Sequence, residues 1–429
     1  MVIHLRAVAR AWLFASPLLL AQQPARQATT AAEAPARDTT YIEPDGTARI
    51  SRVIPVPQDL SPEAQKFISE RVPDETPPEP LAARRSRMDE WGVRSRAEWS
   101  RLCPNHIEES SIGGVPVRIV TPDDMPSGHR DRVLMNLHGG SFNADSGSFA
   151  ESIPIAGYTR IKVVAVLYRL APEHPFPAAI DDAVAVYREL LKTYRSDHII
   201  VYGTSAGAVL TAELAVKLKQ LRLPMPAALG IFSALGSFAR MGDSWALYTL
   251  RGLAGHIEPP DGSVHDPYYV GSTDPRDPVL SPIYADLHGL PPALFISSGR
   301  DALLSGTANL ERAYLRAGID ARLVVFDALP HAFWYHSELP ESIEACHIMS
   351  DFFLVHLPRI TATALSDAQE GHDGVDLRRI NSIAEFGLLV KVVRASSAQV
   401  VRLGVGVGRA VRVLVCETLN RRRRLPEAY

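Results

Sequence analysis

Apolar residues between positions 103 and 357 fall into short continuous runs that alternate with longer stretches of helical periodicity. Continuous apolar runs are typical of strands buried on both faces, and intervening helices favour a parallel sheet covered on both sides. The chain is therefore predicted to be an α/β protein with a mostly parallel sheet. The predicted strands are 115–120, 132–137, 162–168, 198–202, 227–233, 293–297 and 322–326, and the predicted helices are 178–194, 206–221, a segment ending at 317, and 342–357.

Two further helical regions lie outside this alternation. Residues 61–102 begin with Ser61, Pro62 and Glu63, which are an N-cap, a first-turn proline and a first-turn acid. Residues 235–269 carry a helical pattern of their own between two predicted strands. We interpret this second region as an insertion over the carboxyl edge of the sheet, where α/β folds place their sites.

The two ends of the chain do not follow the strand and helix alternation. Residues 1–21 combine Arg6 and Arg10 with an apolar stretch too short to span a membrane, the layout of a cleaved signal peptide. This predicts export to the periplasm or the exterior, with a cytoplasmic protein carrying a disordered leader as the alternative. Residues 22–50 are rich in Ala, Thr, Pro and Gln and predict a disordered linker. Residues 358–429 form a C-terminal extension to which we assign no role.

Composition narrows the classes of partner. The 429 residues are 46% hydrophobic and 22% charged with a net charge of −3, which does not favour nucleic acid as a partner. Cys103, Cys346 and Cys416 are too few and too scattered for a disulfide framework or a zinc site, and none follows the apolar leader as a lipid anchor. We expect no metal, no organic cofactor and no stable membrane anchor.

A candidate nucleophile lies where one predicted strand turns into a helix. The sequence Gly203-Thr204-Ser205-Ala206-Gly207 follows the strand 198–202. A serine on such a corner exposes its hydroxyl, and the small neighbours let the adjoining backbones approach. Alone, the five-residue string also occurs in structural turns, but its position between a strand and a helix favours a nucleophile.

Backbone donors for a developing negative charge are predicted nearby. His138-Gly139-Gly140 ends an earlier apolar strand, and paired glycines there can direct N–H groups at an oxyanion. A tight turn is the alternative use of a glycine pair. Together with the serine corner, we predict Gly139, Gly140 and Ala206 as the donors.

A base and an acid follow later strands in the order that this chemistry uses. His331 lies a few residues after the last predicted strand, and His336 is its rival. Asp301 follows the strand between nucleophile and base, although an aspartate there could simply cap a helix. Asp327 is the alternative acid, but little chain separates it from His331. The order serine, aspartate, histidine is that of α/β hydrolases.

Several motifs together resemble one family. They are the sequence from Tyr168 to Ala179 (YRLAPEHPFPAA), the glycine pair, the serine corner, and Gly289-Leu290-Pro291-Pro292 before the acid. Over about residues 50–357 the chain resembles the hormone-sensitive-lipase-like group of bacterial esterases (family IV) in the α/β-hydrolase superfamily. The resemblance implies an α/β-hydrolase domain over 51–357, with an eight-stranded sheet and a helical cap from 61–102 and 235–269.

The resemblance also implies roles. Ser205 would be the nucleophile, Asp301 the acid and His331 the base of a serine carboxylesterase acting on short- to medium-chain acyl esters. Arg169, Glu173 and Asp182 would organise a loop beneath the site. A lactone hydrolase, a deacetylase or amidase on the same triad, and a non-catalytic ligand-binding protein are the alternatives. The expected partner is a small ester, and the protein is expected to be a monomer or homodimer.

Three positions depart from the family's pattern. Ser141 stands where a third glycine is usual, Thr204 replaces the commoner aspartate, and Ala332 replaces the glycine after the histidine. None of the three removes a predicted catalytic atom.

Overall fold

The computed structural model describes residues 39–51, 54–70, 80–248 and 268–358. All of these belong to one compact unit, residues 1–365. The predicted signal peptide and, apart from Pro358, the C-terminal extension lie outside the described residues.

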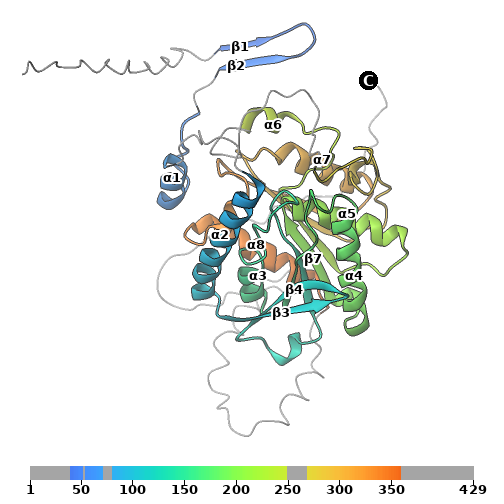
Figure 1. Ribbon diagram of the computed structural model, residues 1–429. Helices are drawn as coiled ribbons and strands as arrows, with labels where there is room; N and C mark the ends of the chain where they lie inside the picture. Colours follow the sequence, from blue (N-terminus) through green and yellow to red (C-terminus); the bar gives the residue numbers. More distant parts are fainter. Residues whose placement is uncertain (1–38, 52–53, 71–79, 249–267, 359–429) are drawn as a thin grey trace, which may run out of the picture. The chain divides into compact units, whose positions relative to one another are not determined.

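One sheet of eight strands organises the described chain, in the order β10-β9-β8-β7-β5-β6-β4-β3 (Figure 1). The six strands from β10 to β6 are parallel to one another, whereas β4 runs antiparallel to both β6 and β3. The predicted mostly parallel α/β sheet is therefore confirmed. The strands are β3 (Asn105–Ile112), β4 (Val115–Pro122), β5 (Val133–Leu137), β6 (Val163–Val166), β7 (Ile199–Thr204), β8 (Ala228–Phe232), β9 (Ala293–Ser298) and β10 (Ala321–Phe326).

Helices cover both faces of this sheet (Figure 1). Neighbouring residues of β5 point to opposite sides: Met135 packs with the helices of one face, and Leu134 with those of the other. Every residue of β5 is buried, Asn136 included, as its mostly apolar pattern predicts. The first face carries α4 (Ala178–Thr193), α5 (Ala206–Gln220) and α7 (Leu304–Arg316), and the second carries α3 (Ser152–Thr159) and α8 (Pro340–His356).

Both predicted cap regions contain helices in their described parts. Residues 61–102 contain α1 (Pro62–Ser69) and α2 (Leu81–Leu102). Ser61 caps α1 as predicted, because its hydroxyl accepts from the Ala64 N–H at 3.0 Å. The insertion contains α6 (Asp243–Tyr248), and its residues 249–267 lie outside the described chain.

Part of the predicted linker is ordered instead. Within residues 22–50 and one residue beyond, β1 (Thr39–Ile42) and β2 (Ala48–Ser51) pair as an antiparallel hairpin. The disordered assignment is therefore wrong for this part. The connecting turn contains Asp45-Gly46, where the Asp45 carboxylate accepts the Thr47 N–H at 2.9 Å and Gly46 has a φ of +89°. Aspartate followed by glycine is a strong hairpin signal between β-branched and aromatic residues.

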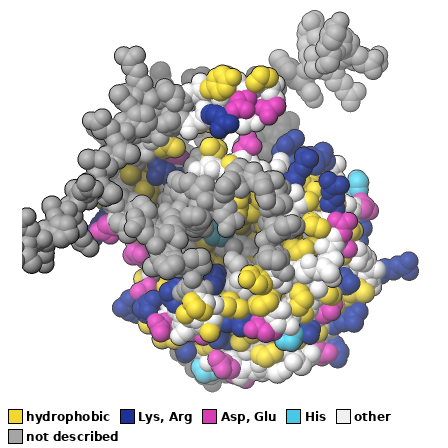
Figure 2. Space-filling view, turned by 45° about the horizontal axis from the view of Figure 1, so that its top comes forward, with side chains coloured by type: hydrophobic (Ala, Val, Ile, Leu, Met, Phe, Trp, Pro, Cys, Tyr) yellow, Lys and Arg dark blue, Asp and Glu magenta, His cyan; other side chains and the backbone are white. Residues whose placement is uncertain are grey.

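The surface is mixed in charge. Figure 2 shows Lys, Arg, Asp and Glu side chains interspersed with hydrophobic ones over the lower part of the face it presents. None of the helices in the described segments is both long and apolar enough to cross a membrane.

Candidate active site

Ser205 occupies a strained corner between β7 and α5. Its φ of 59° and ψ of −122° are unfavourable for a residue with a Cβ, and such strain concentrates at functional sites. Its N–H donates to the Phe232 carbonyl at 2.8 Å, which fixes the corner against β8. A Cβ at Gly203 or Gly207 would lie 2.2 or 1.8 Å from the Leu137 carbonyl oxygen, so both glycines are needed for this close approach.

Asp301 and His331 form a hydrogen-bonded pair at the same edge of the sheet. Asp301 Oδ1 lies 2.9 Å from His331 Nδ1. Asp301 is fully buried, whereas the His331 side chain is 23% exposed. Because β7, β9 and β10 are parallel, the loops after them meet at one edge, and the serine, aspartate and histidine follow those three strands.

Three other groups bind the Asp301 carboxylate. Its Oδ2 accepts from the hydroxyls of Ser233 and Ser297, the latter at 2.8 Å, and Oδ1 also accepts from the Leu303 N–H at 2.9 Å. These donors fix the carboxylate in an orientation that directs Oδ1 at the imidazole.

The pair shifts the pKa of both members. Burial alone would raise the pKa of Asp301, but the charge of His331 and the hydrogen bonds lower it below its ordinary value. Burial alone would lower the pKa of His331, but the adjacent carboxylate and its hydrogen bond raise it. The imidazole is thus favoured as a proton acceptor by its buried partner.

The alternative base and the alternative acid, His336 and Asp327, are not part of this hydrogen-bonded pair. The ring nitrogen of His336 lies 3.4 Å from Glu338, and its ring packs on Phe67. Asp327 is exposed at the end of β10, and no hydrogen bond links it to His331 within the described residues.

The loop after β5, residues 138–144, turns sharply at the predicted oxyanion donors and is called the oxyanion loop. Gly140, Ser141 and Phe142 have successive φ values of 123°, 55° and 58°. A Cβ at Gly140 would lie 2.0 Å from the Ala144 carbonyl oxygen, so glycine is required there. Among the described residues, no protein acceptor is found for the N–H groups of Gly140, Ser141 or Ala206.

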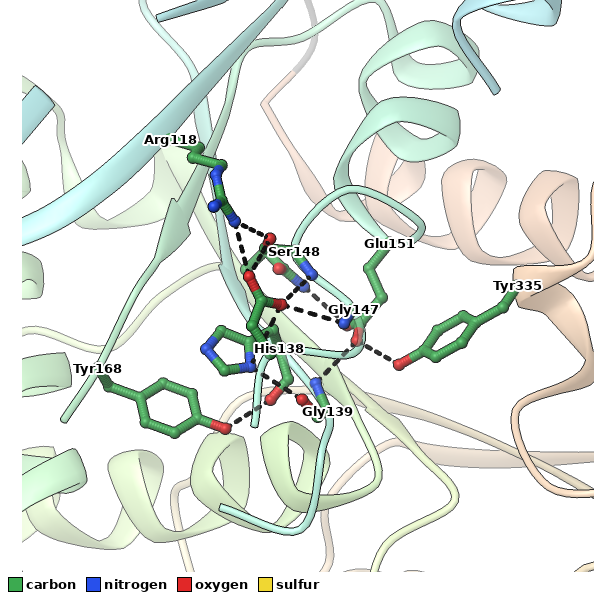
Figure 3. Close-up of polar contacts among 10 residues, drawn as sticks. Arg118, His138, Gly139, Gly147, Ser148, Glu151, Tyr168 and Tyr335 are labelled. Carbon is green, nitrogen blue, oxygen red and sulfur yellow. Dashed lines mark hydrogen bonds and ion pairs between the residues drawn. The ribbon is translucent and has the colours of Figure 1, made fainter. Parts of the chain in front are cut away.

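Gly139 does not fit the predicted donor role. Its N–H donates to Glu151 Oε1 at 3.0 Å, on the buried side of the loop (Figure 3). The Gly139 assignment is therefore corrected, because the chain reverses direction only at Gly140. The available donors in this loop are those that follow the turn, at Gly140 and Ser141.

Sequence reasoning missed the network behind the oxyanion loop (Figure 3). The Glu151 carboxylate also accepts from the Asn136 amide at 2.8 Å and from the Tyr335 hydroxyl at 2.5 Å. His138 stacks on Tyr168, whose hydroxyl donates to the His138 carbonyl at 2.6 Å. These side chains come from segments far apart in the sequence, and no local motif marks them.

The segment between β10 and α8, residues 327–339, carries His331 and is called the histidine loop. Side chains on either side of it fix its course. Trp334 Nε1 donates to the Thr204 hydroxyl at 3.1 Å, and Trp99 Nε1 donates to the Tyr335 carbonyl at 3.1 Å. Thr204, one of the departures noted above, thus connects the nucleophile corner to the histidine loop. Ala332, another departure, has a φ of 55°, a conformation that explains why glycine is usual there.

The motif from Tyr168 to Ala179 contributes structural contacts. Arg169 pairs with Asp182 through its backbone N–H at 2.9 Å and its guanidinium at 2.8 Å. Glu173 instead binds Arg85 of α2 at 2.7 Å, and Arg85 also donates to the Asn143 carbonyl at 2.7 Å. The motif thus connects the predicted cap helix to the oxyanion loop.

Comparisons with known proteins agree with this geometry. A family model described as the α/β-hydrolase fold matches residues 134–335. The chain is 34% identical over 278 residues to an acetyl-hydrolase of Streptomyces hygroscopicus, covering 61% of this chain and 91% of that protein. It is 28% identical over 225 residues to an esterase of Acinetobacter venetianus, covering 52% of this chain and 74% of that protein.

Solved structures give the same result. The crystal structure of an esterase superposes with a TM-score of 0.64 at 30% identity, covering 72% of this chain and 98% of that one. An esterase from the bacterial hormone-sensitive lipase family superposes with a TM-score of 0.60 at 29% identity, covering 70% of this chain and 99% of that one.

Proposed function

The chain belongs to the hormone-sensitive-lipase-like group of the α/β-hydrolase superfamily and is a carboxylic ester hydrolase, and from this premise we propose that it cleaves short- to medium-chain acyl esters through a Ser205, His331 and Asp301 triad. The observation that carries the triad is the buried Asp301 bound to the half-buried His331 at the edge where the Ser205 corner emerges.

The proton path follows from which imidazole nitrogen is occupied. His331 Nδ1 faces Asp301, so Nε2 is the nitrogen that accepts the proton of the Ser205 hydroxyl. The serine oxygen then bonds to the ester carbonyl carbon, and the carbonyl oxygen becomes an oxyanion. Asp301 keeps the imidazole in the required tautomer and stabilises its positive charge.

The oxyanion is held by backbone N–H groups. We assign this role to Gly140 and Ala206, and add Ser141 in place of Gly139, whose N–H is already bound to Glu151. Losing one such donor typically costs about 100- to 1,000-fold in rate.

The second half of the reaction releases the acyl group. Protonated His331 gives its proton to the alcohol oxygen as the ester bond breaks, leaving the acyl group on Ser205. Water then loses a proton to His331 Nε2 and adds to the acyl carbon, and collapse of this adduct returns the proton to Ser205 and frees the acid. None of these steps uses a metal or an organic cofactor.

The acyl group is the finer part of the proposal. The name of the Streptomyces relative, acetyl-hydrolase, supports a small acyl group, and that of the Acinetobacter relative, esterase, supports an ester bond. The test is hydrolysis of p-nitrophenyl esters from acetate to palmitate by the wild type and by Ser205→Ala. Activity that peaks at short chains and is lost in the variant supports the proposal, whereas a folded wild type inactive on every ester contradicts it.

A further inference from the structure

Glu151 is a buried carboxyl beside the candidate active site that the mechanism above does not use. It is 4% exposed and directly precedes α3. We propose that Glu151 is a positioning residue, which holds the oxyanion loop and the histidine loop in one arrangement through Gly139 and Tyr335. This inference rests on the proposed function of the same site.

The first contact is with the oxyanion loop. Glu151 Oε1 accepts the Gly139 N–H at 3.0 Å, one residue before the Gly140 N–H that we assign to the oxyanion. The Gly139 N–H shares one planar peptide unit with the His138 carbonyl, so only the φ and ψ of Gly139 separate this fixed unit from the unit that carries the Gly140 N–H. A Cβ at Gly147 would lie 1.9 Å from Oε1, so only a glycine there lets the carboxylate occupy this position.

The second contact is with the segment that follows the base. The same Oε1 atom accepts from the Tyr335 hydroxyl at 2.5 Å. Tyr335 ends the 3₁₀ turn η4 (Phe333–Tyr335), which begins two residues after His331. One carboxylate oxygen therefore joins Gly139, the residue before the first assigned oxyanion donor of this loop, to the segment carrying the base (Figure 3).

No cationic side chain among the described residues pairs with Glu151. The nearby Arg118 binds Asp145 instead, at 2.6 Å, and the Asp145 carboxylate repels an ionised Glu151. Burial therefore raises the pKa of Glu151 to about 7, although the hydrogen bonds from Tyr335, Gly139 and Asn136 oppose the rise. The charged or titratable side chains around it are Asp145 and His138 of its own loop, Arg118 of β4, Tyr202 of β7, Tyr168 after β6 and Tyr335.

The protonation state of this group changes how strongly it accepts. Hydrogen bonds to a carboxylate are roughly twice as strong as those to a neutral carboxyl group. An ionised Glu151 therefore restrains the Gly139 N–H more tightly than a protonated one.

Two variants and one control separate positioning from general stability. Glu151→Gln keeps the shape and an acceptor oxygen but removes the charge, and Tyr335→Phe removes one donor but keeps the ring. The control is Glu213→Gln in α5, a second fully buried carboxyl, whose Oε2 accepts from the Tyr269 hydroxyl at 2.7 Å. Burial raises the pKa of Glu213 well above its ordinary value, as it does for Glu151, but the hydrogen bond of Glu213 is to Tyr269 and not to Gly139 or Tyr335.

The readouts are kcat and KM for p-nitrophenyl butyrate between pH 5 and 9. We expect Glu151→Gln to lower kcat about tenfold, less than the loss of a whole donor, with KM within about twofold, because the oxyanion exists only after binding. Below pH 7 the wild type loses kcat through two protonations, at Glu151 and His331, and the variant through one. In Tyr335→Phe the Glu151 pKa rises further, because a donor is lost, so its loss of kcat begins at higher pH.

Three results would overturn the inference. They are a Glu151→Gln enzyme with wild-type kcat and wild-type acid dependence, a change confined to KM, or an equal loss of kcat in Glu213→Gln. Failure of the proposed function is a different result, namely a Ser205→Ala enzyme that keeps its activity on the same ester.

Discussion

Replacing Asp301 by asparagine tests the charge of the buried acid separately from its geometry. In Asp301→Asn the amide oxygen can still accept from His331 Nδ1 and the Leu303 N–H, as Oδ1 does now. The new NH₂ group can donate to the hydroxyls of Ser233 and Ser297, because a hydroxyl also accepts. The tautomer of the imidazole is therefore preserved, and what is lost is the negative charge beside it.

The size of the loss follows from Coulomb's law. Two unit charges about 4 Å apart interact by about 4 kcal/mol at an effective dielectric constant of 20. Since each 1.36 kcal/mol is tenfold in rate, losing this stabilisation of the imidazolium lowers kcat about 1,000-fold. The His331 pKa also falls, because the carboxylate that raises it is gone.

The assay is kcat/KM for p-nitrophenyl butyrate against pH, with the melting temperature of each protein as a check on folding. We expect the acid limb of the Asp301→Asn profile to move to lower pH, together with the loss in rate. Asp327→Asn is the matched control, because Asp327 is exposed and follows the neighbouring strand. A loss below tenfold in Asp301→Asn, or an equal loss in Asp327→Asn, would refute this reasoning.

Three further predictions follow from single observations. Gly140→Ala lowers kcat at least 100-fold, because its Cβ would lie 2.0 Å from the Ala144 carbonyl oxygen; kcat comparable to that of the wild type would exclude the assigned donor. In the wild type, kcat/KM falls as the pH drops through a His331 pKa above the ordinary value of about 6.5, and a profile flat down to pH 5 would contradict this. If residues 1–21 are a signal peptide, sequencing of the exported protein starts at Gln22, whereas an intact Met1 in the cytoplasm contradicts export.

The sheet could be predicted from the sequence because its central strands are continuously apolar. The strand β3 was missed since it lies at the edge, where exposed and half-buried residues follow one another without a buried run. Helix α3 was missed as well, because Pro154 and Gly157 interrupt its pattern and its amphipathic periodicity is weak. Such elements depend on tertiary packing more than on local pattern.

The candidate site likewise contains residues that the local sequence predicts and residues that only the tertiary structure reveals. Ser205, Asp301 and His331 could be proposed from the sequence because each follows a predicted strand. Which glycine N–H faces the substrate depends on the dihedral angles of the turn, and these are not encoded in a glycine pair. Glu151 has no local signal, since its partner Tyr335 is 184 residues away in the chain.

Covalent labelling tests the central claim most directly. The wild type and Ser205→Ala are treated with a p-nitrophenyl alkylphosphonate, and the intact mass and labelled peptide are determined. The account predicts one adduct on Ser205, loss of esterase activity in step with labelling, and no adduct in Ser205→Ala. A label on another residue, or full activity after complete labelling of Ser205, would contradict it.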